Sequence, residues 1–279
     1  MISNTHYRVQ AEVNRQTQLS SDISKLQIAI STGKRIQTAS DDPAGAARLA
    51  AIRQSQADQA GWSANARAAS ASAGAADTTL AALGTALARA QELMVSARSA
   101  TASASDRAAA ATELAGIAQD IAGYAAQTDS SGQPLFPAAP LAVPVGDGVA
   151  IAATPSRAEV FTIASAGGGS VDLSTFVASL ATTLAGGGTP AAATLTTLGN
   201  AVTQTADAQA AQGVRTTRLD SAATRLTNAS ADLKAERNDL EQTDLTQAVA
   251  ELQAKMTTLQ AAQALLVKLS NTNLFSMLS

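Results

Sequence analysis

Leucines recur every seven residues near the C-terminus of the chain, in two separate ladders. The first ladder is Leu219, Leu226, Leu233 and Leu240, and the second is Leu245, Leu252, Leu259 and Leu266. A seven-residue apolar repeat is typical of helices that pack along one stripe. The two ladders are out of phase by two positions, so the stripe rotates or the helix breaks between Leu240 and Leu245.

The N-terminal segment predicts a helix from about Thr5 to Ser31 with a similar stripe. From Leu19 onward its larger apolar residues are spaced by four, three and four, and Gln16 interrupts the stripe. The larger apolar residues are Val9, Val13, Leu19, Ile23, Leu26 and Ile30. A lone helix of this kind is marginal in water. We therefore expect the two terminal helices to bury their stripes against each other.

A break separates the first helix from the second. Asp42 is a favourable N-cap, Pro43 suits the first helical position, and Asp41 adds a negative charge at the same end. The residue before a proline avoids the helical region, so the chain is not helical through Asp42. The pattern predicts a second helix from Pro43 to about Ser99, with a hinge formed by Asp41, Asp42 and Pro43.

A third helix is predicted after Ser103 or Ser105, either of which is able to cap it, and it ends near Thr128. Prolines and glycine triplets then concentrate between Gln133 and Pro190. Within this stretch "VGDGVAI" and "EVFTI" are typical of short strands, and "DLSTFVASLATTL" is typical of a short helix. This part is interpreted as a small mixed α/β insertion, and the inner helical pattern resumes from about Ala206 to Leu240.

The amino-acid composition excludes several classes of catalytic and metal-binding site. Aromatic residues make up 3% of the chain, cysteine is absent, and His6 is the single histidine. These counts exclude disulfides, thiolate nucleophiles, histidine triads and multi-histidine zinc sites. The sequence shows no basic patch interleaved with aromatics for nucleic acid, and no membrane-length apolar stretch. We expect no enzyme, no cofactor and no metal. The polar N-terminus does not predict a cleaved signal peptide.

Three stretches together resemble the bacterial flagellin family. They are "STGKRIQTASDDPAGAARLAAIRQSQ", "LARAQELMVSARSATASASDRAAAATELAGIAQDIAGYAAQTDSSGQPLF" and "LEQTDLTQAVAELQAKMTTLQAAQALLVKLSNTNLFSMLS". Within the family, "SDDP", "SDRAAAATELAGI", "DSSGQPLF" and the ending "LFSML" resemble the hook–filament junction type, also called hook-associated protein 3. Gly45 after "DDPA" resembles the filament flagellins instead, so both positions along the flagellum stay open.

The resemblance implies a structural subunit that self-assembles into a helical tube and contacts neighbouring flagellar axial proteins. In the family the terminal helices form a coaxial coiled coil that lines the tube and is disordered in the free monomer. The resemblance also implies export through the flagellar type III apparatus to the extracellular flagellum, and an export chaperone that binds the C-terminal region. More remote alternatives are a helical type III secretion translocator and a signalling coiled coil.

The expected fold is mainly α: a long antiparallel helical bundle with terminal coiled-coil helices and a small mixed insertion. The expected parts are a terminal helix (1–32), a hinge (33–42), inner bundle (43–132), insertion (133–200), inner bundle (201–240) and a C-terminal coiled-coil helix (241–279). The expected assembly interface consists of Val9, Val13, Leu19, Ile23, Leu26, Ile30, Leu245, Val249, Leu252, Met256, Leu259, Leu266, Leu274 and Phe275.

Overall fold

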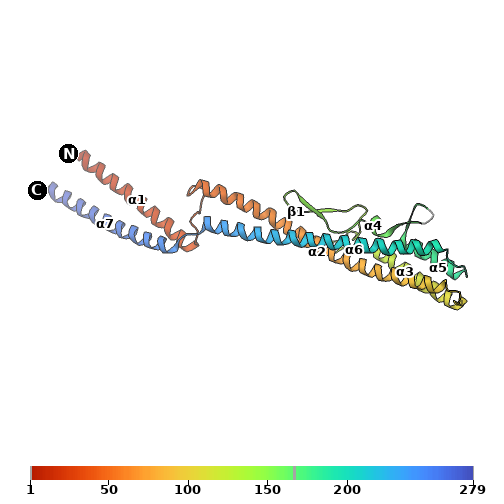
Figure 1. The fold of residues 1–279 in the computed structure, drawn as a ribbon. Coiled ribbons are helices and arrows are strands. Elements are labelled where there is room, and N and C mark those ends of the chain that lie inside the picture. The colour runs from red at the N-terminus through yellow and green to blue at the C-terminus, as the bar shows by residue number, and fades with distance from the viewer. Residues whose placement is uncertain (1, 166–167, 279) are drawn as a thin grey trace. The chain divides into compact units, whose positions relative to one another are not determined.

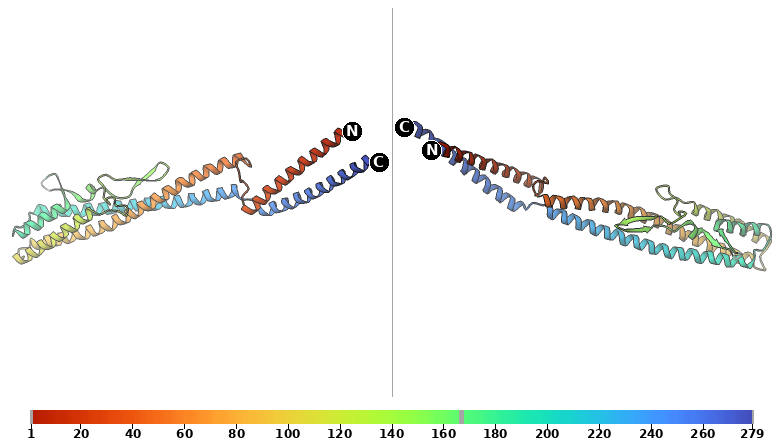
Figure 2. Two further views of the ribbon diagram at one scale, coloured as in Figure 1. Left: turned by 180° about the vertical axis from the view of Figure 1, so that it is seen from behind. Right: turned by 90° about the horizontal axis from the view of Figure 1, so that it is seen from above.

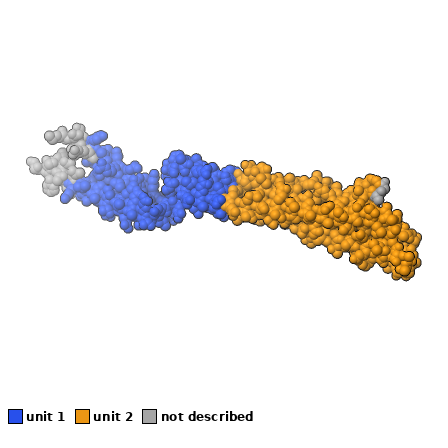
Figure 3. All heavy atoms as spheres, viewed as in Figure 1, with its two compact units in different colours: residues 1–57, 230–279 blue, residues 58–229 orange. Residues whose placement is uncertain are grey.

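The computed structural model describes residues 2–165 and 168–278, and the side chains of residues 2–6, 8 and 269–278 lie outside the description. The chain divides into two compact units (Figure 3). The first comprises residues 1–57 and 230–279, and the second comprises residues 58–229. The chain is mainly helical, as predicted, and two of its helices run through both units.

The first unit contains the two terminal helices, α1 (Ile2–Thr32) and α7 (Leu245–Leu278). They lie side by side and antiparallel, so the two chain ends are neighbours in every view (Figures 1 and 2). The first turns of α2 (Pro43–Ala97) and the last turns of α6 (Ala192–Glu241) complete this unit. The predicted start of the second helix at Pro43 is confirmed, and its glycines do not interrupt α2.

The second unit is a helical bundle around one apolar core. Side chains from α2, α3 (Ala104–Ala125), α5 (Leu173–Ala185) and α6 pack together, with Leu80, Leu114, Leu173 and Leu198 fully buried. Ser103 is the residue that caps α3, because its hydroxyl accepts the amide of Asp106 while the Asp106 carboxylate accepts the amide of Ser103. The helix ends at Ala125, three residues before the predicted end.

The insertion carries two small antiparallel hairpins. Strands β1 (Ala142–Gly146) and β2 (Val149–Ala152) pair across a turn that contains Gly148, whose φ is +65°. Gly148 thus occupies the left-handed region that a tight hairpin turn requires. Val145 and Ile151 pack against α2 and α6 beside the half-buried Trp62.

The prediction of a strand at "EVFTI" is largely wrong. Glu159 to Phe161 belong to a short helix, α4 (Arg157–Phe161), and β3 (Thr162–Ala164) begins after it and pairs with β4 (Ser170–Asp172). Ser156 causes the difference, because its side chain and that of Glu159 form a capping box that starts a helix. The β-branched run then becomes extended, and Phe161 packs edge-on against Phe136 with ring centroids 5.2 Å apart.

The predicted helix in the insertion is confirmed as α5, which Asp172 caps by accepting the amides of Ser174 and Thr175. The last inner helix begins earlier than expected, at Ala192 rather than near Ala206. The extra turns are held by burial, since Leu198 and Ala201 join the core of the bundle. Among the described helices, none combines the length and the apolar character needed to cross a membrane.

Candidate assembly surface

The stripes of α1 and α7 face each other along the terminal helix pair. Ile23 is buried, while Leu26, Leu252 and Leu259 are half-buried between the two helices. Lys255 lies on the same stripe of α7 and donates to the carboxylate of Asp22 at 2.9 Å. The heptad repeats therefore serve first as the seam between the two ends of the same chain.

The structure distributes the expected interface residues over two surfaces. Ile23 is buried in the seam, and six others are partly covered there: Leu19, Leu26, Ile30, Leu252, Leu259 and Leu266. Five are exposed: Val9, Val13, Leu245, Val249 and Met256. Leu274 and Phe275 lie in the last turns of α7, and their side chains lie outside the described residues.

The exposed apolar residues of α7 form a flank beside the seam. Val249 and Met256 are seven residues apart, are 39% and 43% exposed, and each follows the seam position on its helix by one place. Leu245, at the start of the helix, is 50% exposed. Packing α1 against α7 leaves this flank, Leu245, Val249 and Met256, open to solvent. Together with the exposed Val9 and Val13 of α1, this flank is the part of the expected interface that a single chain leaves uncovered.

Sequence reasoning missed some members of these surfaces. Ala248 is buried in the seam and Lys255 is its charged member, yet leucine counting passes over both. Ile28, Leu265 and Val267 are exposed apolar residues outside the predicted interface. The spacing along the chain could have identified both residues. Ala248 and Lys255 each lie three residues after a leucine of the ladder, Leu245 and Leu252, and a heptad seam has its second contact position there.

Gln16 lies on the seam of α1, as the interruption of the stripe suggested. It is half-buried, and its Nε2 atom is buried without a hydrogen-bond partner among the described residues. A buried unpaired amide costs roughly 1–3 kcal/mol. Gln16 thus weakens the outer half of the seam, where Val9 and Val13 are also exposed. Gln263 on α7 is exposed.

Two connectors join the terminal helices to α2 and α6, and they are bonded to each other. The longer connector comprises residues 33–42 and the shorter one Gln242–Asp244. The amide of Arg35 donates to the carbonyl of Glu241 at 2.7 Å, and the amide of Thr243 donates to the carbonyl of Gly33 at 3.0 Å. These bonds make an antiparallel bridge between segments about 200 residues apart in sequence.

The buried carboxylate of Glu241 stabilises the same contact between the two connectors. Glu241 is 8% exposed, and its carboxylate lies 2.9 Å from Nη2 of Arg53 and 3.6 Å from Nζ of Lys34. Burial opposes its charged form, but the hydrogen bond from Arg53 and the charge of Lys34 outweigh burial, so the pKa of Glu241 lies below its ordinary value. Arg35 adds a hydrogen bond to the carbonyl of Leu240 at 3.3 Å.

The predicted hinge residues have distinct roles. Asp42 caps α2, because its Oδ1 accepts the amide of Gly45 at 2.9 Å. Asp41 instead closes the longer connector: the backbone and hydroxyl of Thr38, and then the amide of Gln37, donate to it and lower its pKa. A Cβ on Gly45 would lie 2.5 Å from Asp42 Oδ2 and 2.6 Å from Ile36 Cδ1, so any larger residue there requires these side chains to shift.

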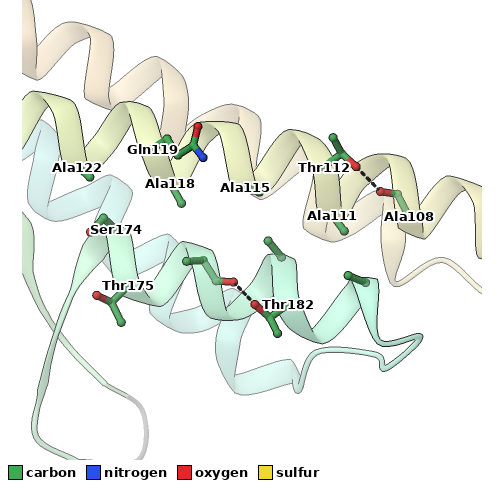
Figure 4. Close-up of a pocket in the computed structure, with 13 residues that line it drawn as sticks. Ala108, Ala111, Thr112, Ala115, Ala118, Gln119, Ala122, Ser174, Thr175 and Thr182 are labelled. Atoms are coloured by element: carbon green, nitrogen blue, oxygen red, sulfur yellow. Dashed lines mark hydrogen bonds between the residues drawn. The ribbon is translucent and has the colours of Figure 1, made fainter.

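A groove of about 840 Å³ lies between α3 and α5 in the second unit (Figure 4). No charged side chain lines it, and alanines such as Ala115 and Ala178 form most of its walls. The hydroxyls of Thr112 and Thr182 donate to carbonyls of their own helices, those of Ala108 and Ala178, both at 3.0 Å. The groove therefore offers a surface for packing. Among the described residues no cluster of histidine, aspartate or glutamate is arranged to hold a metal.

The fold and these surfaces define a helical protein whose two chain ends pair and whose inner helices form a bundle. Residues 3–139 match the family model described as the bacterial flagellin N-terminal helical region, and residues 195–278 match the bacterial flagellin C-terminal helical region. Together the two matches cover well over half of the chain. The chain belongs to the bacterial flagellin family.

Solved structures with the same fold come from flagellar proteins. A Vibrio parahaemolyticus protein described as a flagellar hook-associated protein superposes with a TM-score of 0.63 at 16% identity, over 72% of this chain and 100% of that chain. FlgL from Xanthomonas campestris superposes with a TM-score of 0.58 at 15% identity, over 67% of this chain and 99% of that chain. A comparison with curated proteins finds no match.

Proposed function

We propose that this chain is a structural subunit of the bacterial flagellum that self-assembles at the hook–filament junction. The observation that carries the proposal is the exposed flank of α7, Leu245, Val249 and Met256, beside a seam that the chain's own ends already cover. Family membership and the fold shared with a hook-associated protein and with FlgL support the same position.

The mechanism follows from the energetics of the terminal helices. Fully burying a Val or Met side chain contributes about 1.5–3 kcal/mol, and these side chains are only partly covered in the single chain. Ordering a terminal helix costs about 1–2 kcal/mol per residue in backbone entropy. Neighbouring copies that cover the flank add to the burial that the α1–α7 seam already provides, and so favour the ordered terminal helices at the growing end. Contacts between unlike faces then propagate as a helix or a ring instead of closing on a dimer.

Export and handling belong to the same proposal. The chain leaves the cell through the flagellar type III apparatus. Before assembly, an export chaperone covers the C-terminal region that includes the flank of α7. The chain acts as a building element and not as an enzyme.

The alternative is that the chain is a flagellin of the filament itself. Gly45 is the sequence feature that favours this alternative, because it resembles the filament flagellins. The structure gives Gly45 a local explanation, since any side chain there meets Asp42 and Ile36. The glycine therefore does not favour the filament over the junction. The four sequence features that resemble the junction type remain, and they support the junction over the filament.

Immunogold labelling of flagella from the source bacterium tests the position directly. We expect label in one narrow zone between hook and filament, and a strain without this chain should make hooks but release its filaments. Label along the whole filament would overturn the junction and favour the filament. Normal flagella in the deletion strain, together with no label on the flagella of the parent strain, would overturn both proposals.

A variant pair tests the surface in the same strain. Val249→Glu together with Met256→Glu adds charge to the flank and should prevent filament attachment. Matched control changes are Gln253→Glu and Gln260→Glu, which add the same charge to other exposed positions of α7. Equal motility of the two variants would contradict assembly through the flank.

A further inference from the structure

The pair of terminal helices has two different faces, one on each side of the seam between α1 and α7. Successive residues of a helix are turned by about 100°, so the residue directly after a seam position and the residue directly before it lie on opposite sides. Because the two helices are antiparallel, the following positions of both helices lie on one face of the pair, and the preceding positions lie on the other. Val249 of the flank directly follows the buried Ala248. Glu251 directly precedes the half-buried Leu252 and so lies on the opposite face.

Charged residues avoid the face that carries the flank. Within residues 9–32 of α1 and 245–266 of α7, the charged residues are Glu12, Arg15, Asp22, Lys25, Glu251 and Lys255. Glu12 and Lys255 lie on the seam itself, and the other four directly precede a seam residue. The following face therefore holds only uncharged residues in these ranges, and Val249 and Met256 are exposed there. Because the centres of protein interfaces are depleted of charge, this face is suited to burial against another chain.

A groove of about 800 Å³ lies on the preceding face, where α1, the longer connector and the start of α7 meet. Its buried and half-buried lining residues include Leu26, Ala29 and Ala248. Its exposed lining residues include Lys25 and Glu251, which carry opposite charges. An apolar centre with a polar rim is the usual arrangement of an interface between proteins. The groove is therefore able to receive apolar side chains of moderate size.

The flank and the groove lie at the same level along the helix pair. Val249 of the flank and Glu251 of the groove belong to one turn of α7. Since the two surfaces face away from each other, a chain is unable to place its own flank in its own groove. A second copy beside it in the same orientation brings flank and groove together. Each such contact leaves one flank and one groove unoccupied, so the arrangement continues from copy to copy.

We propose that the flank of α7 in one copy occupies the groove of the neighbouring copy, so that terminal helix pairs pack side by side through unlike faces. The inference rests on the self-assembly proposed above and not on the position of the chain at the junction. Both surfaces require paired terminal helices. The contact therefore belongs to the assembled state, in which neighbouring copies favour the ordered helices.

Cross-linking of the assembled protein tests this contact. The chain has no cysteine, so Val249→Cys in the flank and Ala29→Cys in the groove introduce the only two thiols. The full chain with both substitutions is assembled on hook or filament seeds and treated with a short cross-linker that joins two thiols. We expect a ladder of dimers, trimers and longer oligomers on a denaturing gel, because each copy is linked to two neighbours.

Three controls accompany the measurement. Chains with only one of the two cysteines should remain monomeric after cross-linking, and so should the unassembled chain with both. A matched pair combines Ala29→Cys with Gln260→Cys, an exposed position about 17 Å farther along α7 than Val249, and should give no ladder. Lys25→Cys provides a second position in the groove, so the test does not depend on how Ala29→Cys affects assembly.

The outcomes separate this inference from the proposed function. Normal assembly without a ladder, with either groove position, would overturn the contact between flank and groove and leave self-assembly intact. Dimers from Val249→Cys alone would show that flank meets flank, and an equal ladder from the Gln260→Cys pair would show that the contact is not specific. Failure of the parent chain to assemble on either seed would instead overturn the proposed self-assembly.

Discussion

Asp22 in α1 accepts a hydrogen bond from Nζ of Lys255 in α7 at 2.9 Å, and this contact joins residues 233 positions apart in sequence. The hydrogen bond and charge of Lys255 hold the pKa of Asp22 below its ordinary value, and the same contact raises the pKa of Lys255. Both shifts favour the charged form of the side chain, as expected for an ion pair. The pair adds a polar contact between α1 and α7 to the apolar contacts of the seam.

The pairing of α1 with α7 should weaken in acid. A carboxylate whose pKa is lowered by folding stabilises the folded state above the ordinary pKa of an aspartate, about 3.9, and loses that contribution as the pH falls through the lower folded value. Asp22→Asn removes the contribution at every pH. The difference in α1–α7 association between parent and variant should therefore be largest near neutrality and disappear as the pH falls below the lowered pKa of Asp22. A difference that stays constant with pH would contradict the assignment.

Gly45→Ala should destabilise the start of α2. The new methyl group meets Asp42 Oδ2 and Ile36 Cδ1 at under 3 Å, so the cap or the connector has to move. We expect a loss of about 1–2 kcal/mol, seen as a lower melting temperature. Gly61→Ala in the same helix is the control, because nothing lies within 4 Å of its Cβ position. It should raise stability by about 0.5–1 kcal/mol. Equal effects at both positions would refute the steric argument.

Asp42→Ala combined with Pro43→Ala should loosen the first turn of α2. The change removes the hydrogen bond from the Gly45 amide to Asp42 and the fixed φ of the proline. A lost cap costs about 1 kcal/mol. Asp77→Ala, an exposed acidic position in the middle of α2, is a suitable comparison and should change the melting temperature little. An unchanged melting temperature in the double variant would argue that the cap contributes nothing.

Deleting the chain from Leu266 onward should leave a soluble inner bundle that no longer assembles. The deletion removes the last leucine of the ladder and the outer turns of α7, while the core of the second unit lies between Trp62 and Leu226. Circular dichroism should show a folded bundle, and sedimentation with hook or filament seeds should show no incorporation. Normal growth of polymer from the truncated chain would remove the terminal helices from the assembly mechanism.

Gln212→Met should destabilise the second unit. Gln212 is fully buried on α6, and its amide donates to the carbonyls of Ala153 at 2.8 Å and Ala73 at 3.3 Å. The variant leaves these carbonyls without that donor, at a cost of about 1–3 kcal/mol. Asn228→Ala, at an exposed position of α6, should change stability by less than about 0.5 kcal/mol. If thermal unfolding of the two variants were the same, the buried amide would have no stabilising role.

The helical part of the fold was predictable because its signals are local and repetitive. The leucine ladders, the cap at Asp42 followed by Pro43, and the cap at Ser103 each act within one or two turns. The sequence also indicated the phase break between Leu240 and Leu245, where the shorter connector lies.

The remaining features depend on contacts between distant segments. The bond from Arg35 to Glu241 has no periodic signature, because a single backbone bridge places no demand on side-chain spacing. The early start of α6 follows from burial of Leu198, which is a tertiary effect that overrides the flanking glycines and proline. In "EVFTI" the β-branched residues favoured a strand, but the capping box at Ser156 decided the first half.

The unequal lengths of the connectors give them different tolerance to change during evolution. One residue added to or removed from Gln242–Asp244 would turn α7 by about 100° and direct its leucines away from α1. The exposed turn from Thr38 to Ser40 bulges from the longer connector, so extra residues there lengthen a loop and leave both helices in place. Natural variants of this chain should therefore differ in the length of the connector between α1 and α2. They should keep three residues in the connector between α6 and α7.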